Sequence, residues 1–186
     1  GSGASWTVSQ SRAAHGASSL YFGDPSTQTY DVDARAWGRA VTTPFMVAPG
    51  ATPSISFVVW LHTEETLAYD FLRVLVMDGD QATEVWHSDA IEGTTHGWWQ
   101  PVVAPIDGFG GKEIRIALEF DTVDDLINSY EGAYIDDLKL TSGCCATDSD
   151  CSDPNGCTTS ACAGFGGLCA VEAVAGIRQR ARGGGD

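Results

Sequence analysis

The sequence predicts an all-β protein: an antiparallel β-sandwich of about eight strands, followed by a small cysteine-rich appendage. Twenty-two glycines and seven prolines are spread through the 186 residues and separate short apolar runs, as expected for many strands joined by turns. A hydrophobic share of 43%, with six Trp and seven Phe, indicates a packed core. Up to residue 140 the apolar residues show no sustained helical periodicity, so we expect strands rather than helices.

The first third of the chain contains three strand candidates. Trp6 and Val8 precede an apolar run at residues 18–23, which ends in a turn-prone Gly-Asp-Pro. After a polar loop rich in Asp, residues 38–43 are predicted to form a further strand. Residues 55–61 are apolar, β-branched and aromatic, which favours a central strand.

The middle of the chain continues the same pattern. We expect a strand at residues 70–77, and the Asp-Gly-Asp turn that follows predicts a hairpin with residues 83–86. Residues 98–104 form the next candidate strand. Residues 113–120 alternate apolar and polar side chains more clearly than any other segment, which is typical of a half-buried strand.

The last strand candidate, residues 132–140, closes a strongly acidic stretch. Between Glu119 and Asp137 the chain has seven carboxylates and neither Lys nor Arg, so this charge repels itself unless a cation binds or the groups stay solvated. Calcium (Ca2+), which prefers six to eight hard oxygen ligands, is the predicted cofactor. Strict alternation would place Asp136 on the same face as Leu138, so we expect Asp136 to point inward as a ligand. The candidate ligands are Glu65, Asp70, Asp121, Asp124, Asn128 and Asp136.

The cysteines divide the chain into a sandwich at residues 1–142, a Cys-rich unit at 143–170 and an Arg- and Gly-rich tail at 171–186. All six cysteines fall within residues 144–169, which indicates a disulfide-stapled unit in an oxidising compartment and hence an exported protein. Zinc is the alternative use of such residues, but adjacent cysteines in an exported chain favour disulfides, whose connectivity the sequence leaves open. The predicted disulfide cysteines are Cys144, Cys145, Cys151, Cys157, Cys162 and Cys169.

Five motifs in order resemble the MAM-like jelly-roll module that accompanies secreted bacterial peptidases of the immune inhibitor A type. They are Ser19-Leu20-Tyr21-Phe22, Trp60-Leu61-His62-Thr63-Glu64-Glu65 with Tyr69-Asp70, Gly97-Trp98-Trp99-Gln100-Pro101-Val102, Gly110-Gly111-Lys112-Glu113-Ile114-Arg115-Ile116 and Glu131-Gly132-Ala133-Tyr134-Ile135-Asp136-Asp137-Leu138. The resemblance covers roughly residues 4–142 and implies a jelly-roll fold with a structural calcium near the acidic loops. It brings no peptidase domain, because the chain contains none. The Cys-rich unit is similar to short Cys-rich repeats of exported bacterial proteins.

Composition and motifs exclude several function classes. A formal net charge of -15 argues against binding nucleic acid or an anionic membrane, and no apolar run approaches the ~20 residues needed to span a bilayer. The segment His62-Thr63-Glu64-Glu65 is not the His-Glu-x-x-His of zinc peptidases, and no Gly-x-Ser-x-Gly is present. Carboxylate pairs suit a glycosidase, but they cluster where a metal ion is expected. We therefore predict a protein without catalytic activity.

The predicted function is a calcium-stabilised binding or adhesion module of a secreted or cell-surface bacterial protein, with a protein or a polysaccharide as its partner. One alternative is a structural subunit of an extracellular assembly or filament, because the acidic body and the Arg-bearing tail attract each other. A second is a carbohydrate-binding module, because tryptophans near turns can expose rings on which sugars stack. The candidates for stacking are Trp86, Trp98 and Trp99.

Overall fold

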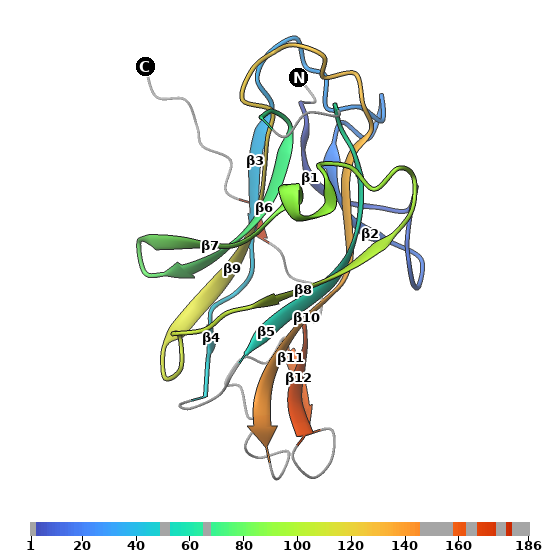
Figure 1. Cartoon of the computed structure of the whole chain (residues 1–186). Coiled ribbons are helices and arrows are strands. Elements are labelled where there is room, and N and C mark those ends of the chain that lie inside the picture. The colour runs from blue at the N-terminus through green and yellow to red at the C-terminus, as the bar shows by residue number, and fades with distance from the viewer. Residues whose placement is uncertain are drawn as a thin grey trace.

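The computed structural model describes residues 3–48, 53–64, 68–145, 158–162, 167–173 and 178–179. Two antiparallel sheets pack face to face, as Figure 1 shows, and confirm the predicted all-β sandwich. The described elements, in chain order, are β1 (Ser5–Ser9), β2 (Ser19–Gly23), β3 (Trp37–Val41), β4 (Phe45–Met46), β5 (Ser54–His62), β6 (Phe71–Asp78), β7 (Gln81–His87), the 3-10 helix η1 (Ser88–Ile91), β8 (Gln100–Pro105), β9 (Glu113–Asp121), β10 (Gly132–Cys145), β11 (Thr158–Cys162), β12 (Gly167–Ala173) and β13 (Arg178–Gln179).

The strand order is that of a jelly roll. In the first sheet, β10 lies between β2 and β5, and β8 pairs with the other edge of β5. In the second sheet, β9 lies between β3 and β6, and β7 pairs with the other edge of β6. The eight strands thus form two four-stranded sheets, β2-β10-β5-β8 and β3-β9-β6-β7, the arrangement of a double Greek key. β1 extends the first sheet beyond β2, and β4 and β13 add short pairings to the second.

The core lies between the two sheets and follows the predicted alternation. On β9, Ile114, Ile116, Leu118 and Phe120 are all buried in the main hydrophobic cluster. The facing sheet contributes alternate residues of β5, namely Ile55, Phe57, Val59 and Leu61. The opposite side of β5 contributes Trp60 to a separate cluster, and the opposite side of β9 carries the buried carboxylates Glu119 and Asp121.

Strand β10 contradicts the strict alternation that the sequence suggested. Asp136 pairs with Val58 and Lys139 with Ser56, so β10 holds one residue more than β5 over this span. The extra residue forms a β-bulge, and Asp137 has the left-handed φ of 53°. The bulge shifts the side-chain register by one. The face toward the core carries the buried Ala133 and Ile135 before the bulge and the partly buried Leu138 and Leu140 after it.

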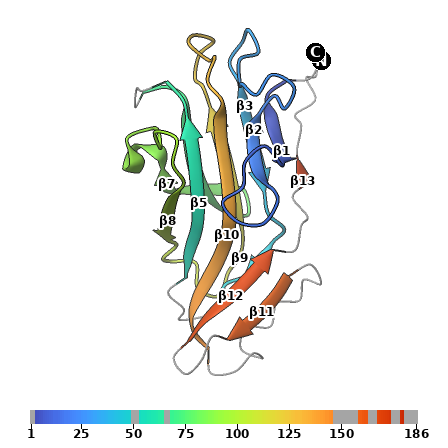
Figure 2. The ribbon, with the colours of Figure 1, turned by 90° about the vertical axis from the view of Figure 1, so that its right-hand side faces the viewer.

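The first sheet continues past the sandwich into the appendage. The far part of β10 pairs with β12, and β12 pairs with β11, as Figure 2 shows below the main sheet. Because β10 ends at Cys145, the sandwich and the Cys-rich unit share one strand. In the register of the hairpin, Cys162 lies opposite Cys169. Cys151 and Cys157 lie outside the described residues, and the six-cysteine disulfide hypothesis stays a prediction. In the part of the chain described, no helix is long and apolar enough to cross a membrane.

Candidate functional site

The predicted calcium ligands are divided among three places in the structure. Asp70, Asp124 and Asn128 belong to the loops at one end of the sandwich, where β6 begins and β9 ends. Asp121 is at the end of β9 and pairs with an arginine, and Asp136 is on β10. Glu65 lies outside the described residues.

Asp70 is the most buried of these carboxylates. It is 1% exposed, and its Oδ2 accepts a hydrogen bond of 2.6 Å from the Tyr30 hydroxyl. Burial raises the pKa of Asp70 to about 7, and the neighbouring charges of Glu64 and Asp124 act in the same direction. Its Oδ1 is buried and has no hydrogen-bond partner among the residues that the structure describes.

Asn128 is also buried and also has a side-chain oxygen without a partner in the described part of the chain. It is 2% exposed, and its Nδ2 donates to the backbone oxygen of Asp124 at 3.3 Å. Its Oδ1 is buried without a partner in the described part of the chain. Buried oxygens without a donor are costly, so each points to a group that supplies positive charge or a proton.

These oxygens fit the donor preference of calcium. A carboxylate oxygen and an amide oxygen, both desolvated and both unpartnered, are hard ligands of the type the ion takes. Glu64 is also buried in the same neighbourhood. Within the described ranges, no three His, Cys, Asp or Glu side chains meet closely enough to form a complete metal cluster by themselves.

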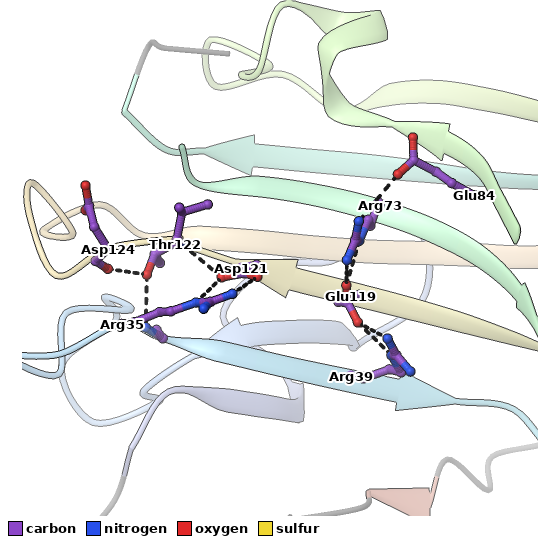
Figure 3. A network of polar contacts seen from close by, with 10 residues as sticks. Arg35, Arg39, Arg73, Glu84, Glu119, Asp121, Thr122 and Asp124 are labelled. Carbon is purple, nitrogen blue, oxygen red and sulfur yellow. Dashed lines mark hydrogen bonds and ion pairs between the residues drawn. The ribbon is translucent and has the colours of Figure 1, made fainter. Parts of the chain in front are cut away.

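The Asp121 carboxylate, by contrast, has hydrogen-bond partners within the chain. The Arg35 guanidinium binds it through two contacts, with Nε donating to Oδ1 at 2.7 Å, as Figure 3 shows. Oδ1 also accepts the backbone N–H of Val123 at 2.9 Å. Asp121 is therefore neutralised within the chain and orders the start of the loop after β9.

Asp136 does not point into the core, which corrects the direction expected from the sequence. Opposite Val58 it shares the outer face of the first sheet with Tyr134, because the bulge comes after it. Its Oδ2 accepts the backbone N–H groups of Ala14 and His15 at 2.8 and 3.0 Å. The carboxylate thus holds the loop between β1 and β2.

The three candidate tryptophans have different environments. Trp86 packs against the main core and meets Phe57 edge to face, with ring centroids 5.3 Å apart. Trp98 is 76% exposed. Trp99 is half-buried and packs against a second aromatic cluster on the outer side of the first sheet.

This second cluster, called here the aromatic layer, consists of Tyr21, Trp60 and Tyr134. The three come from adjacent strands β2, β5 and β10 and are register partners, since Tyr134 pairs with both Tyr21 and Trp60. The Tyr21 and Tyr134 rings stack with centroids 4.4 Å apart, and Trp60 meets Tyr134 edge to face at 5.5 Å. Aromatic pairs of this kind stabilise a face beyond the area that they bury.

A charged pair covers the aromatic layer. The Arg12 guanidinium lies 3.9 Å from the Trp60 ring centroid and binds Glu131 in a fork, with Nε–Oε1 and Nη2–Oε2 distances of 2.6 and 2.8 Å. The Tyr134 hydroxyl donates to Glu131 Oε1 at 2.9 Å. Burial alone would raise the pKa of Glu131, but the hydrogen bonds from Arg12 and Tyr134 outweigh it and lower that pKa.

Sequence reasoning missed Arg12, Trp60 and Glu131 as site residues. The alternation of β5 was one available signal, because Trp60 falls on the opposite parity from Val59 and Leu61. The partners of Trp60 come from distant parts of the chain, and the sequence does not indicate which strands become neighbours.

Comparison with known proteins finds distant similarity to solved structures. No family model matches the chain, and no curated protein matches it. Among solved structures, the CBM22-1 xylan-binding domain of Xyn10C from Paenibacillus barcinonensis is similar, with 15% sequence identity and a TM-score of 0.39. The match covers 73% of this chain and 78% of that chain.

Proposed function

We propose that this protein is a non-catalytic, extracellular module that binds a neutral polysaccharide on the outer face of its first sheet. The observation that carries the proposal is the Arg12–Glu131 pair, which is held on the aromatic layer beside Trp99. A ligand site of this type combines apolar rings with a few polar groups of defined orientation.

The chemistry of the face suits sugar hydroxyls. The fork between Arg12 and Glu131 offers donors and acceptors side by side, and the stacked guanidinium keeps their orientation. Trp99 supplies ring surface next to them, and the preceding residue in the chain, Trp98, is largely exposed. The protein carries a net charge of -15, which favours an uncharged polysaccharide over an anionic one.

A binding role also agrees with the state of Glu131. A glycosidase needs one carboxyl group with a raised pKa as the acid and a second across the scissile bond. The hydrogen bonds from Arg12 and Tyr134 lower the pKa of Glu131 and keep it ionised, which supports binding over proton donation.

Calcium is proposed as the stabilising ion of the module. Asp70 Oδ1 and Asn128 Oδ1 would hold it, together with carbonyls of the adjoining loops, and Glu65 stays a candidate from the sequence. The bound ion would supply the positive charge that these buried oxygens lack. Its role would be to join the loop before β6 to the loop after β9, at the end of the sandwich.

The extracellular setting is supported by the six clustered cysteines, which suit an oxidising compartment. In this setting the module would bind polysaccharide at or near a cell surface. Kinship with MAM-like modules and assembly into a filament stay predictions from the sequence.

The test is binding to a panel of soluble polysaccharides, xylan, β-glucan, mannan and galactan, by affinity electrophoresis and calorimetry. We expect at least one neutral polymer to bind, and the anionic polymer polygalacturonate to bind less. Trp99→Ala and Glu131→Gln should each weaken that binding about tenfold or more, the scale of a lost stacking or charged hydrogen-bond contact. Trp37→Ala is the matched control, because Trp37 is also exposed but belongs to the second sheet. Absence of binding across the panel at millimolar sugar would overturn the proposal.

A further inference from the structure

We infer that Asp136 is the positioning residue of the proposed site: its carboxylate holds the β1–β2 loop so that Arg12 lies over Trp60. The inference rests on the proposed function for its effect on binding. Its structural part, the control of Arg12 by Asp136, can be measured without any ligand.

The bulge in β10 allows Asp136 to face outward while Leu138 faces the core. One extra residue between Asp136 and Lys139 interrupts the pairing with β5, and Asp137 takes up the turn with a φ of 53°. Asp136 keeps the outward direction of Tyr134, two residues before it, while Leu138 returns to the core. A bulge next to a binding face commonly redirects a side chain in this way.

The Asp136 carboxylate accepts three hydrogen bonds from backbone N–H groups. Oδ2 accepts the N–H groups of Ala14 and His15, and Oδ1 accepts the N–H of Asp137 at 2.8 Å. Hydrogen bonds from backbone N–H groups to a charged oxygen are among the stronger ones in proteins. The carboxylate therefore joins the bulge to the middle of the β1–β2 loop.

Two further contacts attach this loop to its surroundings. The His15 ring lies in contact with the Asp137 carboxylate, one residue beyond Asp136. At the other side, the Ser19 hydroxyl donates to the backbone oxygen of Arg12 at 2.7 Å. Arg12 is thus held on both sides, two residues before the N–H groups that Asp136 binds.

Polar contacts hold this loop: besides those of Asp136, Arg12 binds Glu131, and Gln28 Nε2 donates to Ser11 Oγ at 2.8 Å. None of residues 10–18 is fully buried, so apolar packing contributes little to its placement. Without Asp136, the loop that carries Arg12 would be less ordered, and forming the site would cost the entropy of ordering it. The polar contacts of Asp136 prepare the site before a ligand arrives.

The experiment compares Asp136→Ala and Asp136→Asn with Asp78→Ala as a matched control. Asp78 is also a partly exposed acid, but it pairs with Lys112 on the second sheet at 2.6 Å. Amide exchange of Ala14 and His15, and the NMR signal of Arg12 Nε–H, report the loop without ligand. In Asp136→Ala we expect both amides to lose protection and the Arg12 signal to move toward that of a free arginine. Asp136→Asn retains one acceptor oxygen and should be intermediate, so it replaces the alanine variant if that one does not fold.

The binding arm uses the polysaccharide that the panel identifies. Asp136→Ala should weaken binding about fivefold in the wild-type background and hardly at all in an Arg12→Ala background, because contacts that act through one side chain are not additive. Equal losses in the two backgrounds would show that Asp136 does not act through Arg12. Unchanged amide exchange and an unchanged Arg12 signal in both Asp136 variants would overturn the inference, whether or not a polysaccharide binds. If no polysaccharide binds the wild type while the loop responds as expected, the proposed ligand is wrong and the positioning role stands.

Discussion

The Arg12 guanidinium and the Trp60 ring lie in contact across a 48-residue separation in sequence, with 3.9 Å between the guanidinium carbon and the ring centroid. Trp60 is buried on the outer face of the first sheet, where a bare ring would otherwise meet water. Arg12 covers it with a cation that is itself paired to Glu131. The same contact therefore stabilises the sheet and sets the arrangement of the side chains on its outer face.

Replacing Arg12 should therefore affect stability as well as binding. We expect Arg12→Ala to lower the free energy of unfolding by about 1–2 kcal/mol, because it removes a stacked cation and leaves Glu131 without its main partner. Arg12→Lys should recover part of this loss, since Lys retains the charge but not the planar fork. Urea denaturation measures the difference. Equal stability of wild type and Arg12→Ala would show that the contact contributes nothing to the free energy of unfolding.

The pH dependence of Glu131 follows from the sign of its shift. The pKa of Glu131 is lowered from 4.5, so its contribution to stability is complete above 4.5 and is lost as the pH falls through the lower folded value. The difference in thermal midpoint between wild type and Glu131→Gln should be constant from pH 7 to pH 5 and should shrink toward pH 3. Calorimetric scans at these pH values test this. A difference that grows on acidification would contradict the assigned sign.

Calcium should raise the stability of the wild type and have little effect on Asp70→Asn. An ion present at 100 times its Kd stabilises the folded state by about 2.7 kcal/mol. A thermal melt with calcium and with a chelator measures this, and Asp78→Asn, far from the proposed ligands, should respond as the wild type does. A wild-type midpoint that a chelator leaves unchanged would count against the ion.

With the metal removed by a chelator, the stability difference between the wild type and Asp70→Asn reports the protonation of Asp70. Burial raises the pKa of Asp70 to about 7, and Tyr30, Glu64 and Asp124 surround it. Its contribution is therefore complete below its ordinary pKa of 3.8 and is lost as the pH rises through about 7. Asp70→Asn should gain stability relative to wild type as the pH rises from about 4 to about 7, with little further change above that.

Glu119 should be the most costly carboxylate to remove from the second sheet. It is fully buried on β9 between Arg39 of β3 and Arg73 of β6, and Figure 3 shows both guanidinium groups converging on it. We expect Glu119→Ala to destabilise the fold by about 3 kcal/mol, because two arginines lose their shared partner. Glu84→Gln is the control: Glu84 is 44% exposed and 3.6 Å from Arg73, so its loss should cost less than about 0.5 kcal/mol. Similar effects of the two changes in a denaturation series would contradict this assignment.

Gly132 should tolerate no side chain at the start of β10. Its φ is +104°, and a Cβ there would lie 2.3 Å from the backbone oxygen of Phe22 on the neighbouring strand. Gly132→Ala should destabilise the protein by about 2 kcal/mol or more, since both strain and a clash with backbone result. Gly79 has a φ of +58° and open space around it, so Gly79→Ala should cost only the strain. Comparable melting midpoints for the two variants would contradict the close packing of β10 on β2.

Much of the strand arrangement could be predicted from the sequence because period-2 alternation is a local property. In β9 the alternation identified the buried face from Ile114 to Phe120 without knowledge of any neighbour. The hairpin at Asp78-Gly79-Asp80 was similarly local, and β6 and β7 pair around it. The acidic loop after β9 was recognised as a cation candidate from its charge alone.

The site residues depended on contacts that local patterns do not contain. The bulge at Asp137 reverses the alternation of β10. The residues around it nevertheless have the sequence pattern of a regular strand, so the pattern does not reveal the bulge. For that reason Asp136 was predicted to face inward, although it binds the N–H groups of Ala14 and His15 outside the sheet.

The amino-acid sequence by itself determined that this protein is an all-β sandwich, because alternating apolar residues must bury one face of each strand whatever their partners are. The tertiary structure alone decided that Tyr21, Trp60 and Tyr134 form one surface and that Arg12 and Glu131 meet upon it. These residues come from strands and loops far apart in the chain, and only the order of the strands in the sheet brings them to the same place.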